Sequence, residues 1–261
     1  MSAEAEADTE KRRSPLLISI LIFGVLALLV VLASRFYTDY LWFSSVSAST
    51  VFTTQLAARV GLFLGFGLLM GGGLFGSLVL AYRLRPPVRR ANLDSELLLQ
   101  LRDSLDKRSR TLMLLPSVVA GLLGGGVAAS QSQTFLAWTR ATEFGTPDAV
   151  FGLDASFYVF QLPWWRFVLS YVSFMVVVCL VGSLLVHFLT GAMNSTAFRK
   201  TGNLKAAGRA AQRQVSILLG VALLLYGVAS FLDRYGYLTT QNNLFTGVNY
   251  TDATSRIPTS L

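Results

Sequence analysis

The stretch Phe167–Thr190 has the sequence FVLSYVSFMVVVCLVGSLLVHFLT and contains no Asp, Glu, Lys or Arg. A helix rises about 1.5 Å per residue, so roughly 20 apolar residues are enough to cross about 30 Å of lipid hydrocarbon. A helix packed on a globular core would carry a polar residue at every third or fourth position. Because this stretch has no such stripe, it predicts a transmembrane helix.

Four further stretches pass the same test of length and absence of charge: Leu16–Ser34, Val60–Tyr82, Thr111–Ser130 and Val215–Leu232. The composition agrees, since 53% of the 261 residues are hydrophobic and only 14% are charged. An average soluble domain carries about a quarter charged residues. We therefore predict an all-α fold, a polytopic transmembrane helix bundle over residues 16–232 with five spans.

The basic residues predict the orientation of this bundle. Of the 22 Lys and Arg residues, three precede the first span, eight lie in 83–110 and five in 199–213. These three segments face the same side of the membrane, because two spans separate each of them from the next. Loops rich in Lys and Arg stay in the cytoplasm. We expect a cytoplasmic N-terminus and an extracytoplasmic C-terminus, with the bundle in the plasma membrane.

The net charge of +8 is also compatible with nucleic-acid binding. However, the charges cluster beside the spans, where anionic lipid head groups attract each cation by about 1 kcal/mol. The expected partners are therefore the lipid bilayer and anionic head groups at the cytoplasmic face, with no nucleic acid.

The segments outside the spans have different expected roles. Residues 1–15 are expected to be a disordered cytoplasmic tail. Leucines at spacings of three and four over about 92–110 predict an amphipathic helix, which either lies in the membrane interface or packs on its own bundle. Residues 131–166 are expected to form a structured outer loop, and 233–261 an extracytoplasmic tail leading toward a sixth helix beyond Leu261.

The outer segments are rich in aromatic residues and turn signals. Glycines at 145 and 152 predict turns, and Pro163 is expected to stop the aromatic segment before the fourth span. At the end of the fifth span, adjacent Asp233 and Arg234 could pair. The hypothesis is that these loops form a docking surface for an extracytoplasmic domain or partner. Its candidate residues are Trp42, Phe157, Tyr158, Phe160, Trp164 and Trp165.

Glycines four residues apart predict close helix packing, since small residues let helix backbones approach in lipid. The pairs are Gly61 and Gly65, Gly67 and Gly71, Gly72 and Gly76, and Gly121 and Gly125. Packing within the chain is the main expectation, and dimerisation or a hinge is the alternative. His187, the single histidine, either relays protons or bonds a neighbouring carbonyl.

The spans contain no carboxylate or ammonium, and the chain has no phosphate-binding loop, zinc-ligand spacing or nucleophile elbow. We therefore expect no catalytic, cofactor-binding or metal-binding residues, and no enzymatic activity in this chain.

Three segments between the spans resemble a known family: Thr38–Phe43, Phe144–Pro163 and Phe245–Asp252. In that order they are similar to the N-terminal membrane region of the bacterial proteins grouped as uncharacterised protein family 0182. The resemblance implies a longer protein with further membrane helices and a large extracytoplasmic domain, so that this chain is expected to be a fragment or a truncated product. It implies no catalytic residues.

The sequence predicts a non-enzymatic membrane anchor or scaffold that docks or carries an extracytoplasmic domain or partner at the cell envelope. The alternative is part of a transporter or permease whose coupling residues lie outside this chain.

Overall fold

A computed structural model describes residues 15–84, 96–190, 209–239 and 247–256. Within these residues the chain is helical and has no strand, with an isolated bridge between Pro147 and Asp154. The long helices are α1 (Pro15–Ser45), α2 (Ser49–Arg83), α3 (Glu96–Ser130), α5 (Leu162–Leu189) and α7 (Arg209–Asp233). Shorter helical segments are α4 (Ser132–Thr139), η2 (Phe157–Gln161), η4 (Arg234–Thr239) and η5 (Asp252–Arg256).

In the described part of the chain, five helices are long and apolar enough to cross a membrane. They contain the five predicted spans, but most extend well beyond the predicted ends. Residues 35–59, expected to be a loop, are helical except for a tight connection at Val46–Ala48, in which Ser47 has a φ of 57°. Of the helix predicted over about 92–110, residues 96–110 form the first turns of α3 rather than a separate helix, and residues 92–95 lie outside the described residues. Residues 96–110 contain no glycine or proline that would end a helix, so α3 continues through them, whereas residues 35–59 break between α1 and α2 at the positive φ of Ser47 without either residue.

The aromatic segment before the fourth span also differs from its prediction. Residues Phe157–Gln161 form a π-helical turn that runs directly into α5, and Pro163 lies in the first turn of that helix. The expectation that Pro163 stops this segment is wrong. Proline is tolerated there because its fixed φ suits the first turn of α5, and because the regular hydrogen-bond pattern is already interrupted by the preceding π-helical turn, in which the Leu162 N–H bonds the Phe157 carbonyl.

The chain forms two compact units, residues 1–56 and 57–261. In the first unit, Phe52 near the start of α2 packs against aromatic rings of α1. Its ring centroid lies 5.4 Å from that of Phe36 and 5.6 Å from that of Phe43. Such edge and tilted contacts stabilise an aromatic cluster beyond the area that it buries.

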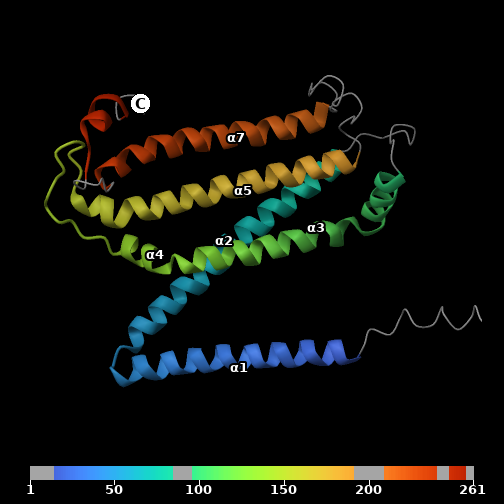
Figure 1. Ribbon diagram of the computed structural model, residues 1–261, viewed down its shortest axis with the longest axis horizontal. Helices are drawn as coiled ribbons and strands as arrows, with labels where there is room; N and C mark the ends of the chain where they lie inside the picture. The colour runs from blue at the N-terminus through green and yellow to red at the C-terminus, as the bar shows by residue number, and fades with distance from the viewer. Residues whose placement is uncertain (1–14, 85–95, 191–208, 240–246, 257–261) are drawn as a thin grey trace, which may run out of the picture. The chain divides into compact units, whose positions relative to one another are not determined.

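In the second unit, α5 and α7 run side by side in opposite directions (Figure 1). The core that joins α2, α3 and α5 has two clusters. One includes Leu74, Leu78, Met113 and Cys179. The other includes Leu62, Met70, Trp164 and Tyr171, and the Tyr171 hydroxyl donates to the Phe66 carbonyl at 2.8 Å.

Four of the eight predicted packing glycines lie where α2 meets α3. A Cβ added at Gly67 would lie 2.9 Å from the carbonyl oxygen of Gly121. A Cβ added at Gly121 would likewise lie 2.9 Å from the carbonyl oxygen of Gly67. Gly71 is comparably close to the carbonyl oxygen of Ser117, and Gly125 is comparably close to that of Phe63. The remaining four have open space at the Cβ position: Gly61, Gly65, Gly72 and Gly76. The two backbones therefore touch within one chain through glycine on both sides.

Gly121→Ala should separate α2 from α3 and lower the free energy of unfolding by about 1–3 kcal/mol, the usual cost of forcing extra volume into a packed site. Gly65→Ala is the matched control. Its Cβ meets nothing, so removing a helical glycine should leave stability equal or raise it by about 0.5–1 kcal/mol. Thermal unfolding in detergent, followed by circular dichroism, measures both. Equal unfolding midpoints for the two variants would contradict the close backbone contact.

Candidate functional site

Residues 140–156 connect α4 to the helical segment that leads into α5, and two aspartates organise this loop. The carboxylate of Asp148 accepts hydrogen bonds from the N–H groups of Val150 and Phe151, both at 2.7 Å, and from that of Leu153 at 3.0 Å. The hydroxyl of Tyr158 donates to the same carboxylate at 2.8 Å. One side chain thus satisfies three backbone donors and ties the loop to η2.

Asp154 has the same role at the other side of the loop. Its carboxylate accepts from the N–H groups of Phe144 and Thr146 at 3.0 Å and of Ser156 at 2.8 Å. The predicted turns are present, with φ of +71° at Gly145 and +67° at Gly152. Glycine adopts such angles at little steric cost, because it has no Cβ.

These bonds favour the ionised forms of both aspartates. For Asp148, burial alone would raise the pKa. The hydrogen bonds from Phe151, Tyr158, Val150 and Leu153 outweigh burial, and the pKa lies below its ordinary value. For Asp154, hydrogen bonds from Ser156 and then from Phe144 hold the pKa well below its ordinary value. Both carboxylates are therefore charged at neutral pH, which strengthens the bonds that order the loop.

The aromatic residues proposed for docking have different environments. Phe157, Tyr158 and Phe160 are half-buried, and the ring of Phe157 packs on that of Tyr235 while that of Phe160 packs on that of Phe144. Trp165 is 46% exposed. Trp42 is exposed on α1, in the other compact unit.

The prediction that Trp164 belongs to the docking surface is wrong, because only 5% of this residue is exposed. Its ring stacks on that of Trp138 at 5.7 Å and contacts those of Phe66 and Phe135. It belongs to the core. Phe144 is a surface residue that sequence reasoning missed, and it is 49% exposed. Its position beside the Gly145 turn was the available signal.

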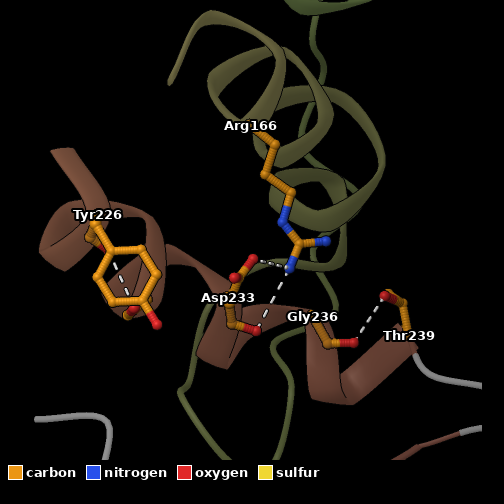
Figure 2. A network of polar contacts seen from close by, with 6 residues as sticks. Arg166, Tyr226, Asp233, Gly236 and Thr239 are labelled. Carbon is orange, nitrogen blue, oxygen red and sulfur yellow. Dashed lines mark hydrogen bonds and ion pairs between the residues drawn. The ribbon is translucent and has the colours of Figure 1, made fainter. Parts of the chain in front are cut away.

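The end of α7 is held to the start of α5 by a charged contact (Figure 2). Arg166 Nη2 lies 3.3 Å from the Asp233 carboxylate and 3.4 Å from its carbonyl oxygen. Arg234 instead stacks on Phe231, with 3.7 Å between its guanidinium carbon and the ring centroid. The predicted pairing of Asp233 with Arg234 is therefore wrong, because consecutive helical residues do not face each other.

A second polar cluster lies near the opposite ends of α5 and α7. His187 is fully buried, and its Nε2 lies 3.0 Å from Gln214 Oε1. The Gln214 amide nitrogen donates to the Ser77 carbonyl at 3.0 Å and to the Ser183 hydroxyl at 3.1 Å. The two serine hydroxyls are 2.7 Å apart. We call these four residues the polar network. It joins α2, α5 and α7.

The geometry of the network assigns the histidine tautomer. Since the Gln214 nitrogen faces two acceptors, its oxygen faces His187, and His187 Nε2 must carry the proton that it donates. His187 Nδ1 is then an acceptor, and it has no hydrogen-bond partner. His187 does bond a neighbouring carbonyl, as expected, and that carbonyl belongs to the side-chain amide of Gln214. Gln214 was missed because it immediately precedes the predicted fifth span.

Comparison with known proteins identifies the family. The family model described as uncharacterised protein family UPF0182 matches residues 16–261. The chain belongs to this family. Within UPF0182 it is 36% identical over 253 residues to a protein of Streptomyces coelicolor, covering 95% of this chain and 25% of that protein. It is 36% identical over 265 residues to one of Mycobacterium tuberculosis, covering 100% of this chain and 26% of that protein.

The UPF0182 relatives are therefore much longer, and this chain spans about a quarter of their length. No solved structure matches the chain. Among the described residues, no group of three or more His, Cys, Asp or Glu side chains is placed to hold a metal ion.

Asp154→Asn should loosen the 140–156 loop, because an amide nitrogen would then face a backbone donor. We expect several-fold faster cleavage of the loop in limited proteolysis at pH 7. Glu143→Gln is the matched control, since Glu143 is an exposed carboxylate outside these hydrogen bonds. Equal cleavage of both variants would contradict the role of Asp154.

The wild-type loop should also respond to acid in a defined direction. A carboxyl whose pKa is lowered by folding stabilises the fold above its unfolded-state pKa, here 3.8, and loses that contribution as pH falls toward the folded-state value. Protection of the loop from pepsin should therefore persist as the pH is lowered to about 3.8 and decline below that value. Protection that already declines between pH 6 and 5 would contradict the lowered pKa values.

Proposed function

We propose that this chain is a non-enzymatic anchor in the bacterial plasma membrane, and that its 140–156 loop docks an extracytoplasmic domain or partner. Five helices of sufficient length and apolarity support the membrane location. The distribution of Lys and Arg supports an extracytoplasmic position for the loop.

The ordered loop is the observation that carries the docking role. Its two aspartates together accept six backbone hydrogen bonds, so the loop conformation is set before any partner binds. A pre-ordered surface loses less conformational entropy on binding than a flexible one. The loop and the following turns expose apolar side chains that are suited to a protein interface: Phe144, Val150, Val159 and Trp165.

The length of the relatives supports the same proposal. Three-quarters of each relative lies outside the region matched here. That remainder is large enough to contain a separate domain, which is the occupant that we propose for the loop.

Part of a transporter is the second candidate, and the polar network favours it. Buried polar groups between transmembrane helices can mark a substrate or ion pathway. Because the predicted spans contain no charged residue, coupling groups would have to be supplied from outside this chain.

Site-specific photo-crosslinking in the bacterium that makes the protein tests the anchor proposal. Phe144 is replaced by a photoreactive benzoylphenylalanine, and Phe174, an exposed ring within α5, is the matched position. We expect a protein adduct at position 144 and lipid adducts at position 174. Asp148→Ala should reduce the protein adduct several-fold by disordering the loop. Absence of a protein adduct at position 144, or a yield unaffected by Asp148→Ala, would contradict docking at this loop.

A further inference from the structure

A cavity of about 630 Å³ lies between α2 and α7, beside the polar network. Its volume falls within the range of roughly 300–1,000 Å³ that is usual for ligand sites. Leu80 lines it from α2 and Leu84 from the turn directly after that helix, and Arg209, Arg213 and Ile217 line it from the first turns of α7. The cavity is therefore apolar along its walls and cationic at the end where α7 begins.

The apolar walls follow from the spacing of the two helices. At the end of α2, apolar positions recur every four residues along one face: Gly76, Leu80 and, directly after the helix, Leu84, whose N–H still bonds the Leu80 carbonyl. On α7, Ile217 and Leu218 lie one turn beyond the arginines. Gly76 leaves space between the helices, since an added Cβ there would meet nothing within 4 Å. This part of the cavity suits a hydrocarbon chain.

The two arginines form the charged end. Arg209 and Arg213 are one helical turn apart and exposed. In the part of the chain that the structure describes, no carboxylate forms an ion pair with either guanidinium. They also belong to the first turns of α7, where the helix dipole adds partial positive charge.

The polar groups at the floor of the cavity are already bonded to one another. Gln214 donates to the Ser77 carbonyl and the Ser183 hydroxyl, and it accepts from His187. The arginine pair is therefore the part of the cavity that can attract a charged group. Its cationic end requires an anion, and its apolar walls require that the anion be attached to hydrocarbon.

We propose that this cavity binds one anionic phospholipid, with its phosphate between Arg209 and Arg213 and an acyl chain along Leu80 and Ile217. Basic pockets between membrane helices are suited to anionic head groups. A free phosphate ion would satisfy the arginines but leave the apolar walls empty. The proposal goes beyond the docking role of the 140–156 loop and does not depend on it.

Native mass spectrometry of the 261-residue chain in neutral detergent tests this site. Phosphatidylglycerol should bind at least tenfold more tightly than phosphatidylcholine with the same acyl chains. The double variant Arg209→Gln and Arg213→Gln should lose roughly thirtyfold in affinity for phosphatidylglycerol, which corresponds to about 1 kcal/mol for each arginine. Arg110→Gln is the matched control, because it removes an exposed arginine of α3 that does not line the cavity. It should bind like the wild type.

A second pair of variants tests the acyl-chain part without changing charge. Gly76→Leu should fill the cavity and weaken phosphatidylglycerol binding severalfold, whereas Gly65→Leu, on the same helix and equally open, should not. Circular dichroism checks that each variant keeps its helical content. If the double arginine variant does not fold, the glycine pair decides the test.

Three results would overturn the proposal. The first is wild-type affinity in the double arginine variant, and the second is wild-type affinity in Gly76→Leu. The third is complete displacement of phosphatidylglycerol by millimolar inorganic phosphate, which would identify a site for a free anion.

Discussion

The outward faces of the long helices are apolar, and this constraint determines the other features of the fold. In the second compact unit, Leu68, Leu123, Phe174 and Leu224 are all more than 60% exposed. Contiguous exposed apolar surface on this scale is rare in soluble monomers. In lipid it carries no penalty, but it also provides no hydrophobic force to bring the helices together. Helix association then has to come from close packing and from polar contacts between helices.

Both kinds of contact are present, at different places. Gly67 and Gly121 bring the backbones of α2 and α3 together, so that dispersion contacts can act at short range. Farther along α2, the polar network connects this helix to α5 and α7 through Gln214 and His187. Interhelical hydrogen bonds of this kind contribute about 0.6 kcal/mol each on average. The network therefore sets the alignment of the three helices more than their overall stability.

The sequence predicted the number and position of the apolar helices, because charge-free runs of this length are distinctive. It did not predict their ends, since hydropathy marks only the lipid-soluble part of a helix, and polar segments such as 35–45 and 96–110 are helical too. The sequence also did not show which of two neighbouring residues is buried. Trp164 and Trp165 have the same chemistry, but they point in directions about 100° apart on α5, so only one reaches the core. Gln214 was assigned to a loop, and its role became visible only when α7 was seen to begin at Arg209.

All of these features follow if lipid, rather than water, surrounds the long helices. The most direct measurement is the sedimentation behaviour of the purified chain when detergent is removed and replaced by plain buffer. The chain should be monodisperse in detergent and should aggregate as the detergent is withdrawn, because its apolar faces then contact water. A folded, monodisperse chain in buffer without any amphiphile would contradict it.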